Sequence, residues 1–302
     1  MRRVLTVFVV LNLLCWGAAP DSIDAADVGI FLRCTGKTEP REALQAVRGL
    51  GLHMVQVSKL PDRFYSPEGA REFATLLKET GVQASTVVAV YDGENYKDIP
   101  TIRATVGFMP AAFMEQRVAY TKKCVDFAAA LKVKIVTFHV GFLPLESKDP
   151  DYQRLVRAVR DVSQYAAKRG VTISLETGQE SAEELLQFIS QVSQRNVGVN
   201  FDMANLVLYG KDDAPAALHM LLPKVTSVHV KDGLPPEDPA RLGAETRLGE
   251  GKAGVRECLR QLKAAHFRGP VVIENYVFRG RKTEPMAELA LAKAYVDQVL
   301  AQ

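Results

Sequence analysis

The chain has 302 residues, of which 47% are hydrophobic and 24% are charged, and its formal net charge is +3. This balance is typical of a soluble globular protein, and the length suffices for one large hydrophobic core. The net charge is too small, and the Lys and Arg residues are too dispersed, to indicate a nucleic-acid-binding protein.

The amino-terminal segment, residues 1–26, has the layout of a secretory signal peptide. Arg2 and Arg3 precede an apolar run over 4–16, and small residues follow at 17–19. The run is too short for a comfortable transmembrane span. We therefore expect export to the bacterial periplasm or the medium, and a mature protein, residues 27–302, without a membrane span. An unprocessed segment would instead leave the protein cytoplasmic or anchored by its amino terminus.

Three cysteines remain in the mature chain, Cys34, Cys124 and Cys258. Their odd number and wide spacing indicate neither a disulfide framework nor a cysteine-based zinc site. We expect them to be small buried side chains.

From residue 27 onward, short apolar runs alternate with segments of helical periodicity, eight times in all. The predicted strands are Val28–Leu32, Leu52–Val57, Ala84–Val90, Lys134–Val140, Val171–Glu176, Val197–Asp202, Val225–Lys231 and Pro270–Asn275. The predicted helices are Pro40–Gly49, Ser66–Gly81, Phe113–Leu131, Tyr152–Arg169, one capped by Ser181, Pro215–Leu222, one ending near Ala265, and one starting at Thr283. Two long loops, Tyr91–Pro110 and Asp232–Ala253, interrupt the pattern.

Strict alternation of strands and helices requires parallel strands. Eight such units in this length predict a closed (β/α)8 barrel, a TIM barrel, in one domain over residues 27–302. An open sheet that binds dinucleotides would carry a glycine-rich fingerprint after its first strand. The residues at that point, 34–37, form only a short turn, which disfavours the open sheet.

Polar side chains end the last four predicted strands: Glu176, Asp202, His229 and Glu274. In a barrel, the carboxyl ends of all strands meet at one face. Three carboxylates in a partly dry cavity repel one another, and a divalent cation removes that conflict. Two Glu, one Asp and one neutral imidazole suit one Mn²⁺, Mg²⁺, Co²⁺ or Zn²⁺ ion. The alternative is that these are separate polar residues or helix caps.

Several short motifs give the chain, from Val28 to its end, a recognisable pattern. They are Leu-Glu-Thr at 175–177, Asn-Phe-Asp at 200–202, His-Val-Lys-Asp at 229–232, Leu-Gly-Glu-Gly at 248–251 and Val-Ile-Glu-Asn at 272–275. With them the chain resembles the sugar phosphate isomerase/epimerase family of xylose-isomerase-like barrels. The resemblance implies that Glu176, Asp202, His229 and Glu274 bind the metal. It also implies that Glu176 and Glu274 are the catalytic acid/base pair, that the ligand is a small sugar or keto sugar, and that a homodimer or homotetramer can form.

Three positions depart from the ketose epimerases of that family. A histidine commonly lies three residues after the strand-six Asp, where this chain has Asn205. A glutamate that binds substrate falls on Ala182, and an arginine after the strand-seven His falls on Pro235. Arg247, further along the same loop, is placed to reach back instead. These departures concern the substrate more than the metal.

Other polar residues are candidates for substrate binding. We expect His139, Lys231 and Gln56, at or near strand ends, to contact substrate, as Asn205 and Arg247 would; burial with a hydrogen-bond or ion-pair partner is the alternative. Glu250 is expected to support a metal ligand, or else to be a solvated loop acid. The loop Tyr91–Pro110 is expected to cover the barrel mouth.

These observations favour a metal-dependent sugar isomerase or epimerase that removes a proton next to a carbonyl through an enediolate. A dehydratase or lyase acting on a cyclic polyol or keto-glycoside would use the same enediolate. A nuclease related to the AP endonucleases needs several zinc ions and many histidines, whereas only His139 and His229 end strands. The non-enzymatic alternative is a barrel that binds metal and sugar without turnover.

Overall fold

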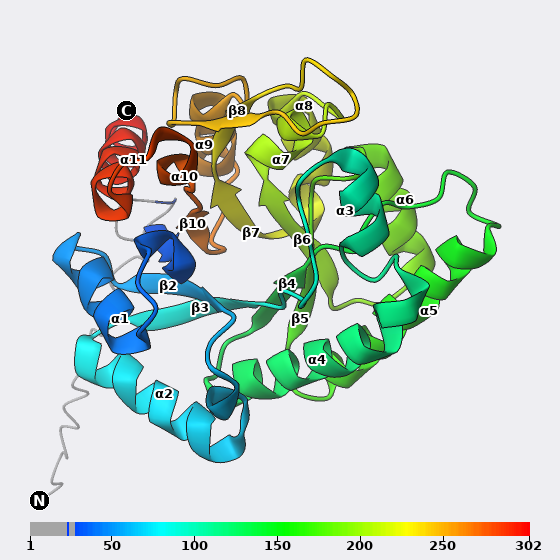
Figure 1. Cartoon of the computed structure of the whole chain (residues 1–302), viewed down its shortest axis with the longest axis horizontal. Helices are drawn as coiled ribbons and strands as arrows, with labels where there is room; N and C mark the ends of the chain where they lie inside the picture. Colours follow the sequence, from blue (N-terminus) through cyan, green and yellow to red (C-terminus); the bar gives the residue numbers. More distant parts are fainter. Residues whose placement is uncertain (1–22, 24–27) are drawn as a thin grey trace, which may run out of the picture.

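The computed structural model of this chain describes residue 23 and residues 28–302. The predicted signal segment therefore lies outside the described residues, apart from Ile23. Eight parallel strands close into a barrel that helices surround, which confirms the predicted (β/α)8 architecture (Figure 1). In barrel order these strands are β1 (Val28–Phe31), β10 (Val271–Ile273), β7 (Val225–Val230), β6 (Val197–Asp202), β5 (Thr172–Glu176), β4 (Ile135–Phe138), β3 (Gln83–Val88) and β2 (Met54–Ser58).

The helices that connect the strands pack against the outside of the barrel (Figure 1). The longer ones are α1 (Pro40–Gly49), α2 (Pro67–Thr80), α4 (Ala111–Ala130), α5 (Pro150–Ala167), α6 (Ala182–Val192), α8 (Ala214–Leu221), α9 (Val255–Ala264) and α11 (Pro285–Leu300). Shorter elements are η2 (Leu32–Thr35), η3 (Asp62–Tyr65), α3 (Ile99–Thr105), α7 (Met203–Leu208), η4 (Leu222–Lys224) and α10 (Val277–Arg281). Among residues 28–302, no helix has the length and apolar character needed to span a bilayer.

Local sequence signals set the ends of several helices. Ser181 precedes α6; its hydroxyl accepts a hydrogen bond from the Glu184 N–H, and the Glu184 carboxylate accepts one from the Ser181 N–H. This capping box satisfies two N–H groups that have no partner inside or before the helix. Gly81 follows α2 with a φ of 66°, a left-handed conformation that glycine adopts without strain. The chain therefore positions these helices largely through its own local chemistry.

Two different environments are buried in the molecule. Between strands and helices, large apolar side chains such as Phe73 and Phe188 are fully buried, and the three described cysteines are buried there as predicted. The barrel interior is more polar. Gln56 of β2, Asn200 of β6 and Ser227 of β7 are fully buried; the Ser227 hydroxyl donates to Asn200 Oδ1, and Gln56 Oε1 pairs with His229 Nε2. Barrel interiors are usually filled by branched apolar residues, so this polar interior indicates a built site above it.

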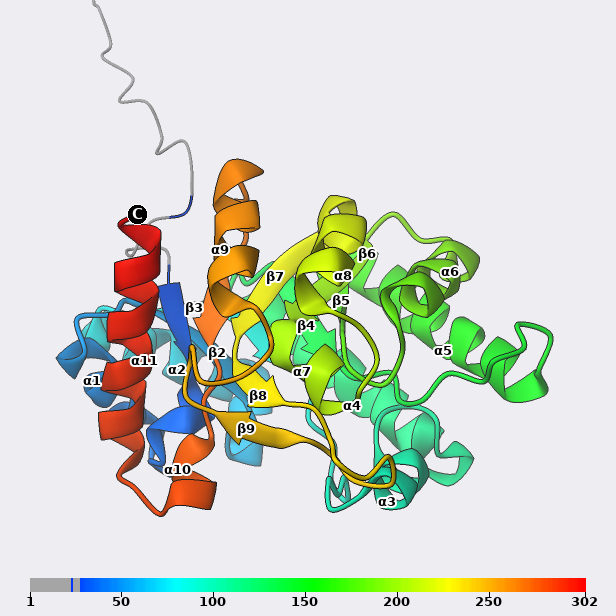
Figure 2. The same cartoon turned by 90° about the horizontal axis from the view of Figure 1, so that it is seen from above.

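Both long predicted loops contain regular structure that the sequence analysis did not anticipate. The first contains α3, and the second contains the antiparallel hairpin β8 (Asp232–Leu234) and β9 (Ala244–Thr246). Figure 2 shows α3, this hairpin and α10 at the same end of the barrel. The helix α3 had a local signal: Asp98 caps it by accepting the Thr101 N–H, and Pro100 lies in its first turn. Proline at that position starts a helix instead of marking a loop.

The Asp232 carboxylate closes the base of the second loop. Its two oxygens accept hydrogen bonds of 2.8–3.1 Å from the backbone N–H groups of Gly233, Gly249, Gly251 and Ala253. A Cβ at position 251 would lie 2.1 Å from the Asp232 Oδ1 atom, so only glycine allows this approach. Hydrogen bonds to a carboxylate are stronger than those between neutral groups. We call this four-fold contact the Asp232 clamp.

We expect Asp232→Asn to lower the free energy of unfolding by about 1–3 kcal/mol, because an amide offers one acceptor atom and turns an NH₂ group toward backbone donors. Urea denaturation followed by circular dichroism measures the change. Glu237→Gln alters an exposed acid in the same loop and serves as the control. Equal unfolding midpoints for the two variants would contradict the stabilising role of the clamp.

Candidate metal centre

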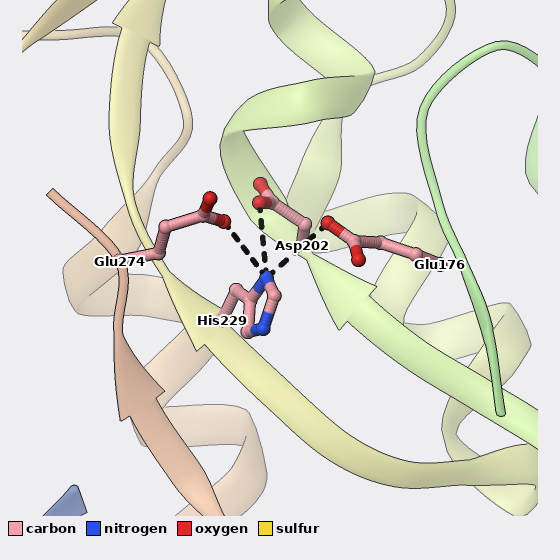
Figure 3. Close-up of side chains that lie close together, drawn as sticks. All are labelled: Glu176, Asp202, His229 and Glu274. Atoms are coloured by element: carbon pink, nitrogen blue, oxygen red, sulfur yellow. Dashed lines mark ion pairs between the residues drawn. The ribbon is translucent and has the colours of Figure 1, made fainter. Parts of the chain in front are cut away.

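Four side chains meet at the carboxyl ends of four adjacent strands. Glu176, Asp202 and His229 come from β5, β6 and β7, and Glu274 directly follows β10. One ligand atom from each lies within 4.8 Å of all the others, and all four residues are buried. Figure 3 shows the three carboxyl groups turned toward the imidazole. The Nδ1 atom of His229 is 2.9 Å from Glu274 Oε2, 3.3 Å from Glu176 Oε1 and 3.4 Å from Asp202 Oδ2.

Strand register explains why these residues meet. Asp202 of β6 lies directly beside His229 of β7, and Glu176 of β5 lies beside Asn200 of β6. Side chains two residues apart on a strand share one face, so Asn200 and Asp202 both point into the barrel. The convergence predicted from the strand ends is therefore a direct result of parallel pairing.

A hydrogen bond and a ring contact fix the orientation of the His229 imidazole. Its Nε2 atom lies 2.6 Å from Gln56 Oε1, a carbonyl oxygen that only accepts hydrogen bonds, so Nε2 is the donor. The Phe31 ring stacks on the imidazole with a centroid distance of 6.0 Å. With Nε2 carrying the proton, the Nδ1 lone pair of the neutral ring faces the carboxylates, which is the orientation that a metal ligand needs.

The positive charge of Lys231 offsets part of the negative charge of the carboxylates in the cluster. Lys231 Nζ lies 3.6 Å from both Asp202 Oδ2 and Glu274 Oε2. Burial alone would raise the pKa of Glu274, but the charges of Lys231 and His229 hold it well below its usual range. Burial raises the pKa of Asp202 despite Lys231. Burial would lower the pKa of His229, yet the carboxylates of Glu176 and Glu274 raise it well above the usual value.

The donor set fits a divalent cation. Asp202 Oδ2, His229 Nδ1 and Glu274 Oε2 are buried atoms without a hydrogen-bond partner in the described part of the chain. Leaving such atoms unsatisfied is costly. Together with Glu176 they offer three oxygens and one nitrogen, a set that suits Mn²⁺, Mg²⁺, Co²⁺ or Zn²⁺.

A cavity of about 820 Å³ opens above this cluster. Glu176, His229 and Glu274 form part of its lining, and so do three residues predicted to bind substrate: His139, Lys231 and Asn205. His139 Nε2 lies 3.5 Å from Glu176 Oε1. The Asn205 amide links two groups, because its Nδ2 donates to Glu176 Oε1 (3.3 Å) and its Oδ1 accepts from Lys231 Nζ (3.3 Å). All three side chains therefore lie at the cavity wall beside the cluster.

Three other predicted site residues lie elsewhere. Gln56 is fully buried beneath His229 and does not line the cavity, so it holds the His229 imidazole and does not face the space open to a ligand. Arg247 forms two 2.8 Å hydrogen bonds with the buried Glu288 carboxylate of α11, outside the cavity lining. Glu250 is exposed and pairs with Arg281, so the expected support of a metal ligand is replaced by a surface ion pair.

Two acids that line the cavity were missed by the sequence analysis. Glu94 accepts hydrogen bonds from the N–H groups of Tyr91 and Gly107, and burial raises its pKa. Glu245 of β9 accepts one from the Tyr276 N–H, and burial raises its pKa to about 7. Nothing in the sequence separates these acids from solvated loop residues. The length of the two loops was the available signal.

We expect Mn²⁺ to raise the melting temperature of the protein and EDTA to reverse the effect, because the cation binds the folded state only. Binding should release protons and weaken as pH falls, since a proton on His229 competes with the metal. Titration calorimetry in buffers of different ionisation enthalpy, repeated at several pH values, measures the proton release and the change in affinity.

We expect Asp202→Asn to weaken Mn²⁺ binding by more than about 10-fold, whereas the exposed Glu237→Gln should leave Mn²⁺ binding unchanged. Full affinity in Asp202→Asn would exclude the site.

We expect Gln56→Leu to weaken Mn²⁺ binding by about 10- to 100-fold, because the imidazole loses the acceptor that fixes its tautomer and orientation. Titration calorimetry gives the dissociation constant. Ser58→Ala, a change at a buried residue of the same strand whose hydroxyl forms no hydrogen bond in the described structure, is the matched control. If both variants bind Mn²⁺ equally well, Gln56 does not position the ligand.

Comparisons with known proteins agree with this architecture. A family model described as the xylose isomerase-like TIM barrel matches residues 44–294. The crystal structure of a xylose isomerase domain protein from Planctomyces limnophilus has 36% sequence identity and a TM-score of 0.80, and the match covers 85% of this chain and 91% of that one. The structure of L-ribulose 3-epimerase has a TM-score of 0.68 at 17% identity, covers 91% and 94% of the two chains, and shows a likeness of fold.

The inosose dehydratase of Klebsiella pneumoniae subsp. pneumoniae is a more partial relative. It is 27% identical over an alignment of 144 positions that covers 42% of this chain, and the chain spans about half (48%) of the length of that enzyme. The family model, in contrast, extends from α1 into α11 and includes every strand end of the metal centre. This chain belongs to the xylose isomerase-like TIM barrel family.

Proposed function

We propose that this protein is a metal-dependent sugar epimerase or isomerase that moves a proton on a carbon next to a carbonyl group. The observation that carries the proposal is the position of Glu176 and Glu274. Both line the cavity, and Figure 3 shows their carboxyl groups approaching His229 from opposite sides. Two carboxylates on opposite sides of one substrate carbon can remove a proton from one face and return it to the other.

The four-residue cluster would hold the cation required by this reaction. A divalent cation bound by Glu176, Asp202, His229 and Glu274 would polarise the substrate carbonyl and stabilise the negative charge that develops on it. The chain contributes further positive charge, because the buried Lys231 ammonium faces the same cavity. His139 and Asn205 offer polar atoms that would orient the sugar hydroxyls.

The choice among related reactions depends on where the proton returns. Return to the opposite face of the same carbon inverts its configuration, and return to the neighbouring carbon moves the carbonyl. A dehydratase or lyase is the second candidate, favoured by the partial match to inosose dehydratase. It would begin with the same proton removal and continue with loss of water. The mass of the product separates the two, because epimerisation conserves mass and dehydration does not.

The predicted signal segment would place this reaction outside the cytoplasm. We propose that the mature protein acts on a sugar or keto sugar in the periplasm or the medium, as a homodimer or homotetramer. The layout of residues 1–26 supports export. Cell fractionation of the native host, with mass spectrometry of the amino terminus, tests the location and the cleavage together.

We expect the Mn²⁺-loaded protein to incorporate deuterium from D₂O into a keto sugar, with Glu176→Gln and Glu274→Gln each lowering the rate by about 10²–10⁴-fold because an amide cannot accept the proton. NMR of the recovered sugar, at saturating Mn²⁺ for every variant, measures the exchange. Glu237→Gln is the control. Wild-type rates in both amide variants would exclude this chemistry. A wild-type protein that binds Mn²⁺ and sugar but exchanges no proton would be a sugar-binding barrel.

A further inference from the structure

The cavity extends beyond the part that the reacting carbons need. Its volume of about 820 Å³ lies near the upper end of the range of about 300–1,000 Å³ that is typical of small-molecule pockets. Glu176 and His229 mark the region of the metal centre. On the side formed by β10, β1 and β2, which are neighbours in the barrel, the cavity continues toward the rim. This side offers room for another part of the substrate.

Four basic side chains line that side of the cavity. Arg279 and Arg281 lie in α10 after β10, Arg33 lies in η2 after β1, and Lys59 directly follows β2. Because the carboxyl ends of adjacent parallel strands lie next to each other, these residues share one side of the mouth. All four are exposed to solvent. Their charged groups are therefore accessible to a ligand that enters the cavity.

Ion pairing within the protein leaves two of these cations available. Lys59 Nζ lies 2.8 Å from Asp92 Oδ1, and Arg281 forms an ion pair with Glu250. Within residues 28–302, by contrast, Arg33 and Arg279 form no ion pair with an acid. The nearby Glu245 carboxylate already accepts a hydrogen bond from a backbone N–H. The guanidinium groups of Arg33 and Arg279 thus line the cavity without an ion-pair partner among the described residues.

A row of aromatic rings connects these arginines to the metal centre. The Arg279 guanidinium carbon lies 4.1 Å from the centroid of the Tyr276 ring, a cation–π contact that holds the side chain over the ring. Tyr276 packs edge-on against Phe31 at 6.3 Å, and Phe31 precedes Arg33 by two residues. Phe31 in turn stacks on His229 at 6.0 Å. These contacts hold Arg279 at a fixed position relative to the reacting end of the cavity, and Arg33 follows the ring of Phe31 on the same side.

We propose that the substrate carries an anionic group, a carboxylate or a phosphate, that binds Arg33 and Arg279 while its carbonyl end lies at the metal centre. This inference rests on the proposed function. Guanidinium groups bind both anions through paired, charge-assisted hydrogen bonds. Unpaired cations at the mouth of a cavity also attract anions from solution, an effect that salt weakens. The substrate class is thus an acidic or phosphorylated keto sugar, with its charge remote from the reacting carbon.

The activity test supplies ketohexoses of several configurations in three forms: neutral, as the hexuronate, and as the 6-phosphate. Deuterium uptake with Mn²⁺-loaded protein gives kcat/KM for each. One charged form should exceed its neutral counterpart by about 10-fold or more. Arg33→Gln and Arg279→Gln should each remove most of that advantage, because they lower kcat/KM for the charged form far more than for the neutral form. The preferred form identifies carboxylate or phosphate.

Arg63→Gln is the matched control, because the Arg63 guanidinium also lies over a ring, that of Phe64 at 4.4 Å, but does not line this cavity. A second measurement is independent of turnover. Calorimetry compares hexitol 6-phosphate and hexonate, which have no carbonyl group, with the neutral hexitol. The anions should bind the wild type about 10-fold more tightly than the hexitol, and the Arg33→Gln/Arg279→Gln double variant should lose this difference.

The two measurements separate the anion site from the proposed reaction. If no sugar takes up deuterium while the anions still bind through the arginines, the proposed reaction is wrong and the anion site stands. The anion site is wrong if neutral and charged sugars react equally well, or if the variants slow both forms by the same factor. It is also wrong if the double variant binds the anions as tightly as the wild type, because the metal centre alone would then hold them.

Discussion

Three buried carboxylates that meet at one point repel one another, and the residues around and beneath them must offset this repulsion. Glu176, Asp202 and Glu274 surround His229 and are shielded from bulk water. Such a group is stable only where positive charge and hydrogen bonds replace the lost hydration. Lys231 supplies part of that charge from within the barrel. The polar interior beneath the cluster and the fit to a divalent cation follow from the same requirement.

Most of the barrel could be predicted because its strands repeat one pattern, an apolar run ended by a polar residue. The bounds of α1 and β6 agree with the prediction residue for residue. The hairpin of β8 and β9 could not be predicted, because contacts from distant parts of the chain hold it in place. The Gly243 N–H, for example, donates to the carbonyl of Leu208 in α7. No pattern within the loop itself indicates that partner.

The candidate site also contains residues that could be predicted from the sequence and residues that could not. The four clustered residues could be predicted to meet because each ends a strand, and parallel pairing brings strand ends together. The role of Gln56 could not, because it lies 173 residues from His229 in the sequence and contacts it only once the barrel closes. The sequence could not decide where Arg247 points for a related reason. Its side chain is long enough to reach in several directions, and the buried Glu288 carboxylate of α11 determines which one it takes.

The Asp232 clamp has a consequence for how barrels of this kind diversify. It fixes both ends of its loop next to Lys231, so the tip over 235–243 can change in length or composition without moving the residues below. The tip also contacts the other long loop, since the Ile99 N–H donates to the Ala240 carbonyl. These two segments would therefore be exchanged as a matched pair. The two long loops at the mouth of the barrel would then change together during evolution, while the clustered residues below them keep their positions.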